Sequence, residues 1–268
     1  MLKFICFGSG SSGNCYYINV EGYGLLIDLG IGLRGFKRDM RNYGLSFGEI
    51  KAQLVTHDHT DHVKSVGAFS GEFHLPVYAS ELVHQGMQRN YFMSKKIAAE
   101  YRHVVIPGEE FVLGPYIITP FEVPHDSMGN CGYFITAGDT SFCIVTDMGH
   151  VTDEIRSYVA RAHYLVIEAN YDAGMLASGP YPPFLKRRIA GDRGHMDNAE
   201  TARLLAESLS PEARRVWLCH LSEENNHPEL ARKTVESALA EAGKLGGDAR
   251  LQLEVLKRKV PSPLYELE

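Results

Sequence analysis

The sequence lacks several features that would place it in whole classes of protein. It has no run of eighteen apolar residues, the length that a membrane-spanning helix requires. The apolar residues near its start end at Gly8, after too few positions for a secretory signal. Its five cysteines are odd in number and none are spaced as C-x-x-C, which does not suit a disulfide framework. We therefore expect a reduced, cytoplasmic protein without a membrane segment.

Positive charge is also scarce. Lysine and arginine number 27 against 33 aspartates and glutamates, a net charge of −6, so composition neither indicates nor excludes nucleic-acid binding. The hydrophobic fraction of 44% and charged fraction of 22% are ordinary for a globular protein. No repeat, low-complexity tract or linker interrupts the 268 residues, so we expect one domain over residues 1–268.

Short apolar runs bounded by turn residues predict strands. The predicted strands lie near the amino terminus and at 16–20, 23–27, 52–56, 77–79, 116–121, 132–136, 141–146, 164–168 and 215–219. Helical spacing predicts helices at 80–93, 151–161, 197–209 and 228–242. Residues 173–194 and 223–228 are expected to be loops, and 137–140 a hairpin turn. The pattern predicts a layered α/β fold.

A dense group of metal-ligand residues follows one predicted strand. His57, His59, Asp61 and His62 stand within six positions. Alternation along an extended chain would let His57 and His59 reach one ion, and a turn into a helix would let Asp61 and His62 face a second. So many such ligands are far more typical of a metal site than of a polar turn that is rich in histidine.

Other predicted strands end at similar side chains. Asp28, His125, Asp147 and His220 each lie at or just after a strand end. Taken singly, each would be an ordinary polar group at the edge of a core. Because strand ends on one rim of a layered α/β domain converge, the four together are expected to bind metal or to support its ligands.

These motifs, in this order, resemble the metallo-β-lactamase superfamily. The resemblance implies a four-layer αββα sandwich with two divalent ions at one rim. The ligands that it implies are, for the first ion, His57, His59 and His125 and, for the second, Asp61, His62 and His220. Asp147 would bridge the ions, and Asp28 would fix the His-rich loop by hydrogen bonds. Two ions roughly 3.5–4 Å apart can hold a hydroxide as nucleophile, which Asp61 could orient. The ligand set suits zinc, manganese and iron alike.

A second pair bears on the reaction. Glu168 follows a predicted strand and His195 precedes a predicted helix. The pair resembles the glutamate and histidine with which the transfer-RNA 3′-processing branch of the superfamily acts on the leaving group. A histidine oriented by a carboxylate can protonate the expelled alkoxide. The alternative is that Glu168 caps a strand and His195 a helix.

Two segments could contact phosphate. Residues 186–193 are rich in arginine and lysine, which pair with phosphates, and the Gly/Ser turn at 8–14 could cradle a phosphate with its backbone amides. An ordinary solvated face and a flexible connection are the alternatives. The predicted substrate-binding residues are Ser11, Ser12, Asn14, Arg187 and Arg193.

Longer motifs narrow the resemblance to the YycJ (WalJ) group. They are the turn at 8–14, the His-rich segment at 56–62, and residues 168–172, 194–198 and 220–229, so the likeness runs over about residues 3 to 240. Members are described as metal-dependent hydrolases with 5′-to-3′ exonuclease activity on DNA and a proposed link to mismatch repair. Many carry Leu-Ser where this chain has Met196-Asp197, a departure that leaves His195 in place.

The leading hypothesis is a dinuclear metal-dependent phosphodiesterase that acts as a 5′-to-3′ DNA exonuclease, holding DNA with local loops or as a homodimer. The first alternative is a small-molecule or cyclic-nucleotide phosphodiesterase, which the scarcity of positive charge favours. A thioester or lactone hydrolase would not need Glu168 and His195. A non-catalytic metal module would need a closed site, and a secreted β-lactamase would need a signal sequence. We expect His150 to cap the helix that begins near Thr152; the alternative is that it lines the site.

Overall fold

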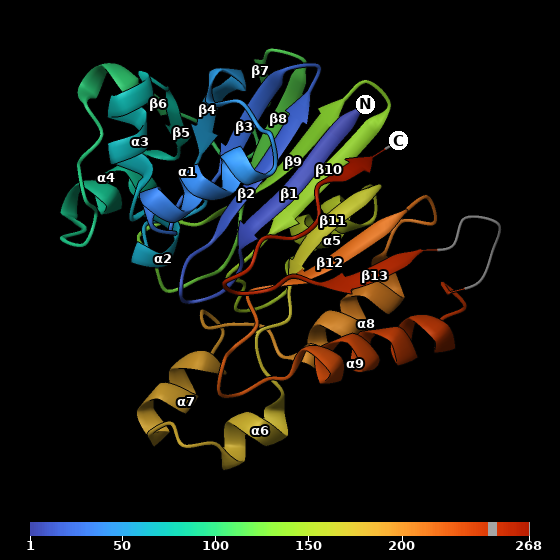
Figure 1. Cartoon of the computed structure of the whole chain (residues 1–268). Helices are drawn as coiled ribbons and strands as arrows, with labels where there is room; N and C mark the ends of the chain where they lie inside the picture. Colours follow the sequence, from blue (N-terminus) through green and yellow to red (C-terminus); the bar gives the residue numbers. More distant parts are fainter. Residues whose placement is uncertain (246–250, 268) are drawn as a thin grey trace.

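The structure is a computed structural model that describes residues 1–245 and 251–267, and it is a sandwich of two mixed sheets (Figure 1). The first sheet contains, in spatial order, β14 (Tyr265–Leu267), β1 (Leu2–Gly8), β2 (Cys15–Val20), β3 (Tyr23–Ile27), β4 (Ile50–Leu54), β5 (Val77–Ala79) and β6 (Arg102–Val104). The second contains β13 (Gln252–Val255), β12 (Arg215–Cys219), β11 (Tyr164–Glu168), β10 (Thr140–Val145), β9 (Cys131–Ala137), β8 (Tyr116–Glu122) and β7 (Phe111–Leu113).

Helices cover the outer faces of both sheets. The first sheet carries α1 (Leu33–Asn42), α2 (Thr60–Val63), α3 (Val66–Phe73) and α4 (Glu81–Arg89) (Figure 1). The second carries α5 (Asp153–Val159), α8 (Asn198–Ser208) and α9 (Pro228–Glu241). Two short helices, α6 (Ala173–Ser178) and α7 (Pro183–Ile189), project from one end, and single 3₁₀ turns span Phe47–Glu49 and Ala99–Tyr101. This is the four-layer αββα sandwich that the family resemblance implied.

Three buried clusters separate the layers. On β1, Phe4 and Cys6 belong to the cluster between the sheets, whereas Ile5 and Phe7 belong to the cluster beneath the first sheet's helices. Because side chains alternate along a strand, β1 is apolar on both faces. Trp217 of β12 lies in the middle layer, with its ring centroid 4.5 Å from that of Phe4. A further cluster packs α5, α8 and α9 on the second sheet.

Strand direction decides where a site can form. Strands β3 to β6 are parallel to one another, and so are β10 to β13. Their carboxyl ends meet at one rim, where loops from both sheets converge, as expected for layered α/β proteins.

The predicted strands and helices all form, with shifts of a few residues at their ends. Residues 137–140 form the turn between the antiparallel strands β9 and β10. All five cysteines are buried and free. None of the helices formed by residues 1–245 and 251–267 is long and apolar enough to cross a bilayer.

The prediction of a loop at 173–194 was wrong, because this segment contains α6 and α7. The side chain of Asp172 accepts the amide of Met175 and caps α6, and Pro183 occupies the first turn of α7, a position that suits proline. A small apolar cluster that includes Leu176 and Ile189 joins the two helices. Proline and glycine here mark helix ends rather than an irregular chain.

The prediction that His150 caps α5 was also wrong. Thr152, not His150, caps α5, because its Oγ1 accepts the amide of Ile155 at 3.2 Å. His150 is exposed, and its Nδ1 lies 2.7 Å from the carbonyl oxygen of Asp192.

Candidate metal centre

The candidate site lies at the rim where strands end. Asp28 follows β3, Asp147 lies just after β10 and His220 follows β12, and their φ angles are 58°, 55° and 53°. A left-handed backbone costs a non-glycine residue about 1–2 kcal/mol, and such strain gathers at functional sites. Contacts at the rim offset this cost. An oxygen of Asp147, for example, lies 3.5 Å from Nδ1 of His220.

Three imidazoles form the first ligand cluster. His57 and His59 come from the loop after β4 and His125 from the loop after β8, and one ring nitrogen of each lies within 4.8 Å of the others. Nε2 of His57 is buried without a hydrogen-bond partner among the described residues. Burial lowers the pKa of His57 and of His125, which keeps these rings neutral. A buried, unpaired ring nitrogen among neutral imidazoles fits a metal ion.

A second cluster lies beside the first. Ligand atoms of Asp61, His62 and His220 lie within 4.8 Å of one another. An oxygen of Asp147 is 3.2 Å from Nε2 of His62, and Asp147 also groups with His57 and His62. The structure therefore brings all seven predicted ligands together, with Asp147 between the two clusters.

The buried carboxylates of the second cluster require nearby positive charge. Burial by itself would raise the pKa of Asp61, but His62 and His220 hold it at about 2. Burial would likewise lower the pKa of His220, but Asp147 and Asp61 outweigh it and raise that pKa to about 10. Protons on the imidazoles can balance the carboxylates. A divalent ion would supply this charge and leave the ring nitrogens as ligands, so these residues fit a divalent metal.

Asp28 holds the His-rich loop. One of its oxygens accepts the amide of Thr56 at 2.8 Å, and the other accepts the Thr56 hydroxyl at 2.8 Å. The second oxygen also lies 2.7 Å from Nδ1 of His62. A carboxylate that binds one ring nitrogen fixes the direction of the other, so Asp28 orients Nε2 of His62 toward the cluster.

The turn at 8–14 serves the site differently from the expectation. Asn14 is buried, and its amide nitrogen lies 2.8 Å from Nε2 of His62 and 3.4 Å from an oxygen of Asp61. It is thus a neighbour of the predicted ligands, and its role in substrate binding stays a prediction. Ser11 and Ser12 are exposed and make no hydrogen bond with another described residue, so they are free to meet a substrate.

Glu168 and His195 form a close pair beside the ligands. Glu168 is fully buried at the end of β11, and its Oε1 lies 2.8 Å from Nδ1 of His195 and 3.1 Å from Nδ1 of His220. Its Oε2 accepts the backbone amides of Met148 and Met196 at 2.9 and 3.1 Å. Every oxygen of this carboxylate therefore has two donors.

The charge of Glu168 acts on His195. Burial alone would lower the pKa of His195, but Glu168 outweighs it and raises that pKa above its usual value. The His195 side chain is 17% exposed, and no hydrogen bond joins its Nε2 to another described residue. Glu168 and His195 also lie within ligand distance of Asp147 and His220, but the four donors on Glu168 favour an orienting role.

The cations near His195 are mostly engaged. Lys186 donates to a backbone carbonyl, and Arg188 forms an ion pair with Asp126. Arg187 is exposed and has no ion pair within the described part of the chain. Of the three basic residues on α7, Arg187 alone presents a free charge.

Arg193 also differs from the expectation. Its guanidinium donates to the carbonyl oxygen of His125 at 2.8 Å and to that of Ser127 at 3.4 Å. It therefore supports the loop that carries a predicted ligand, and its role in substrate binding stays a prediction. Nδ1 of His125 lies 2.9 Å from the carbonyl oxygen of Gly194, so residues 193–194 hold this loop from two sides.

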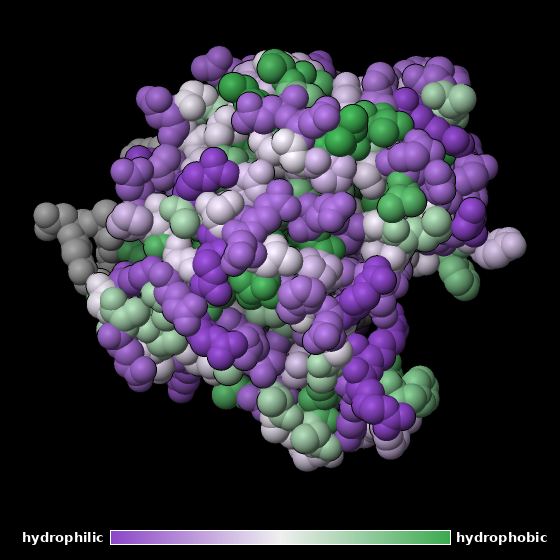
Figure 2. Space-filling model, turned by 180° about the vertical axis from the view of Figure 1, so that it is seen from behind, coloured by the Kyte–Doolittle hydropathy of each residue, from purple (hydrophilic) through white to green (hydrophobic). Residues whose placement is uncertain are grey.

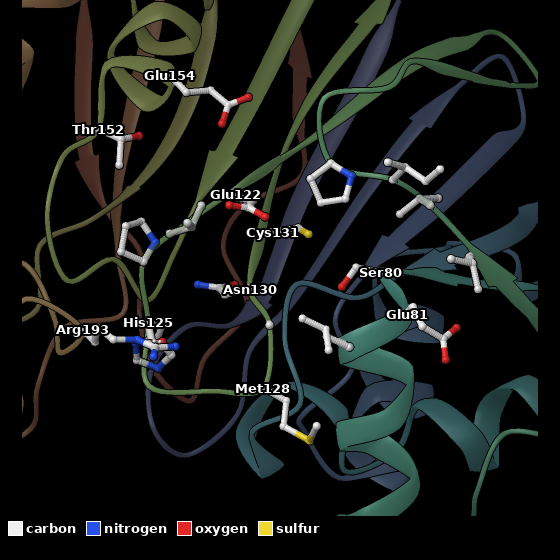
Figure 3. Close-up of a pocket in the computed structure, with 18 of the residues that line it drawn as sticks. Ser80, Glu81, Glu122, His125, Met128, Asn130, Cys131, Thr152, Glu154 and Arg193 are labelled. Carbon is white, nitrogen blue, oxygen red and sulfur yellow. Dashed lines mark hydrogen bonds between the residues drawn. The ribbon is translucent and has the colours of Figure 1, made fainter.

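A large, mainly apolar cavity of about 680 Å³ adjoins the site (Figure 3). His125 and Arg193 lie on one side of it and Glu81 on the other, and Glu122 and Glu154 also line it. Three carboxylates make this cavity unsuitable for a polyanion.

Several supporting residues escaped the sequence analysis. The amide nitrogen of Asn170 donates to the carbonyl oxygen of His220 at 2.7 Å, and the hydroxyl of Ser9 accepts the His220 amide at 2.9 Å. Asp126 lies 3.4 Å from Nε2 of His125. Asp126 directly follows His125, and Ser9 and Asn170 lie in segments that the sequence analysis named without giving them a role. The contacts of Asn170 and Ser9 depend on pairing between distant segments.

Comparisons with known proteins agree with this geometry. The family model described as "Beta-lactamase superfamily domain" matches residues 23–221. The chain is 32% identical to "Exodeoxyribonuclease YycJ" of Bacillus anthracis, over 92% of this chain and 93% of that protein. It is 33% identical to "Exodeoxyribonuclease WalJ" of Streptococcus pneumoniae, over 99% and 98%.

Solved structures share the fold at lower identity. The metallo-beta-lactamase fold protein YhfI of Bacillus subtilis has a TM-score of 0.70 at 19% identity, covering 97% of this chain and 98% of its own. Zn²⁺-bound PqqB of Methylobacterium extorquens has a TM-score of 0.71 at 17% identity, covering 97% and 99%. The chain thus belongs to the beta-lactamase superfamily of metal-dependent hydrolases and, within it, to the YycJ/WalJ group.

Proposed function

We propose that this protein is a dinuclear metal-dependent phosphodiesterase that removes nucleotides from DNA in the 5′-to-3′ direction. The observation that carries the proposal is the Glu168–His195 pair, joined at 2.8 Å directly beside the seven-residue ligand set. Hydrolysis of a phosphodiester expels a basic alkoxide, which a positioned histidine can protonate. The names of the two curated relatives, both exodeoxyribonucleases, support DNA as the substrate.

The ligands divide between two ions of zinc, manganese or iron. The residues that would hold the first are His57, His59 and His125, and those that would hold the second are Asp61, His62 and His220, with Asp147 shared. When bound, such ions activate water at neutral pH and stabilise negative charge on the phosphate. Asp61, whose side chain is 23% exposed, is placed to orient the attacking water.

The protein's own contribution to bond breaking is a proton held on His195. Glu168 binds Nδ1 and raises the pKa of the ring, so Nε2 carries a proton toward the partly exposed side of the site. Ser11, Ser12 and the free guanidinium of Arg187 are the described groups that remain available for phosphate contacts from the predicted set. We also propose that residues 1–268 act as one hydrolase domain.

A second candidate is a hydrolase of small phosphodiesters or cyclic nucleotides. The observation that favours it is the engagement of Arg188 by Asp126 and of Arg193 by backbone carbonyls, which leaves few free cations for a long polyanion. The same catalytic residues would serve this reaction.

One experiment separates the two functions. Metal-free protein would be reloaded with Mn²⁺ or Zn²⁺ and given linear duplex DNA or a 2′,3′-cyclic nucleotide, with Asp61→Ala as the inactive variant and Asp139→Ala, an exposed residue of the β9–β10 turn, as the matched control. Release of nucleotides from DNA by wild type and Asp139→Ala, but not by Asp61→Ala, is the expected result. Metal-dependent turnover of the cyclic nucleotide alone would favour the second candidate, and turnover of neither would refute both.

A further inference from the structure

Two adjacent aromatic side chains stand fully in solvent next to the metal centre. Tyr91 and Phe92 follow α4 and are 96% and 75% exposed. Neither ring stacks on another ring within residues 1–245 and 251–267. Scattered apolar residues are common on surfaces, but a contiguous exposed pair beside a site is informative.

The segment that carries them is anchored to the His-rich loop. The amide nitrogen of Asn90 donates to the carbonyl oxygen of Asp58 at 2.8 Å, and its Oδ1 accepts the amide of Phe92 at 2.9 Å. The next residue, Met93, is buried in the core beneath the first sheet's helices. The chain is thus held on both sides of the exposed pair, which fixes the backbone of Tyr91 and Phe92 relative to the ligand loop.

One open cavity of about 520 Å³ joins these rings to the predicted ligands. Its lining residues are Asp58, His59, Thr60, Asp61, Gly86, Arg89, Asn90, Tyr91, Phe92 and Arg188. Seen from behind, the molecular outline is indented between the region of α4 and the projection formed by α6 and α7 (Figure 2), which is where this cavity opens.

The cavity also has a free positive charge. The guanidinium of Arg89 is exposed, its one hydrogen-bond contact is to Sδ of Met128 at 3.7 Å, and it forms no ion pair within the described part of the chain. Arg188, on the opposite element, is neutralised by Asp126. Aromatic faces, one unpaired cation and two predicted metal ligands therefore line the same space. The Asp58 carboxylate also lines it, and its Oδ1 accepts the amide of Met128 at 3.1 Å.

We infer that Tyr91 and Phe92 form a stacking platform for an unpaired nucleobase of the strand whose phosphate lies at the metal centre, with Arg89 on a neighbouring phosphate. This inference rests on the proposed function and specifies its substrate as a polynucleotide with an unstacked base at this point. Stacking on aromatic side chains tolerates every base, because each base has a π face. Such a platform suits an enzyme that removes successive nucleotides regardless of sequence.

The test combines protein variants with missing bases. Single-stranded oligonucleotides with a 5′-phosphate would carry an abasic nucleotide at the first, second or third position, or none, as DNA and as RNA. The proteins would be wild type, Tyr91→Ala, Phe92→Ala, Phe92→Leu and Phe92→Tyr. Phe184→Ala is the matched control, because Phe184 is a similarly exposed phenylalanine on α7 that does not line this cavity.

The expected loss in kcat/KM on the intact strand is roughly five- to a hundredfold for Phe92→Ala, the range measured when stacking aromatics are removed. Phe92→Leu should lose as much kcat/KM as Phe92→Ala, because leucine is nearly as large as phenylalanine but has no π face. Phe92→Tyr should retain kcat/KM, because tyrosine keeps the aromatic ring. One abasic position should cost wild type a similar factor and cost Phe92→Ala nothing more, because the two changes remove the same contact. Losses that multiply at every abasic position, an equal loss in Phe184→Ala, or alanine variants that retain wild-type kcat/KM would overturn the inference.

A binding measurement tests the stacking platform independently of nuclease activity. Fluorescence of 2-aminopurine, placed at the same positions, would report stacking on metal-free protein without hydrolysis. Quenching by wild type and not by Phe92→Ala, in a protein that cleaves no oligonucleotide, would support the platform and refute the nuclease. Cleavage without quenching and without dependence on the base would support the nuclease and refute the platform. Larger losses of kcat/KM and stronger quenching with RNA than with DNA would support the stacking platform but indicate RNA as the substrate.

Discussion

Removal of the His195 imidazole should slow the reaction in proportion to the basicity of the leaving group. The structure holds Nδ1 of His195 on Glu168 at 2.8 Å and leaves Nε2 toward the exposed side. A positioned general acid contributes about 10²–10⁴-fold to rate, or about 3–5 kcal/mol at 1.36 kcal/mol per tenfold. We expect His195→Ala to lower kcat on DNA by a factor in this range.

The neighbouring carboxylate predicts a smaller effect of the same kind. In Glu168→Gln, the amide NH₂ must face either the two imidazoles or the two backbone amides that Glu168 now accepts. In either orientation the NH₂ group of the glutamine faces N–H donors and cannot accept their hydrogen bonds. Loss of one charge-assisted hydrogen bond, about 1.5–3 kcal/mol, corresponds to about 10- to 150-fold in kcat if that loss is felt in the transition state.

The assay compares two leaving groups at saturating metal. DNA expels a basic alkoxide, whereas thymidine 5′-(p-nitrophenyl phosphate) expels p-nitrophenolate, which needs no proton. His195→Ala should therefore slow DNA cleavage strongly and release of p-nitrophenolate by less than about tenfold. Bound metal would be measured for each variant by elemental analysis, because Glu168 also contacts His220. Equal slowing of both substrates by a variant that retains its metal would refute the proton-donor role.

Three further predictions concern stability and metal retention. Burial raises the pKa of the thiols of Cys6 and Cys131 to about 12, so the stability that each protonated thiol contributes is complete below pH 9. It should fall by about 1.4 kcal/mol per pH unit per thiol between pH 9 and 12, as urea unfolding can measure. A flat profile would contradict the burial of these thiols. Asp28→Asn should weaken metal affinity about 10- to 100-fold, because Asp28 orients His62. A chelator titration showing wild-type affinity would count against that role. Gly30→Ala should fail to fold stably, because its Cβ would lie 1.7 Å from a backbone oxygen of α2. A normal melting temperature would contradict this packing.

The ligand set could be predicted because its residues lie next to local strand signals. Each of His57, His125, Asp147 and His220 follows a short apolar run within three residues, and strand ends converge by a general rule of layered folds. The four-layer arrangement was expected from the family resemblance rather than from any single segment.

Residues whose roles depend on distant partners could not be predicted in this way. Asn14 contacts His62 across 48 positions, and Arg193 contacts the backbone of His125 across 68. Local composition reports only polarity and charge, so it could not predict these contacts with the ligand residues. The helices α6 and α7 were missed for a similar reason, since the apolar cluster that joins them is assembled from residues 171 to 189.

The direction of digestion would show whether this protein is a 5′-to-3′ exonuclease. A linear duplex with one 5′-phosphate end, labelled on that strand at its 5′ terminus in one sample and at its 3′ terminus in another, would be digested by the manganese-loaded protein and sampled over time. We predict immediate release of the 5′ label as a mononucleotide, while the 3′ label passes through a descending ladder. Early release of the 3′ label, or internal fragments from both samples, would contradict it.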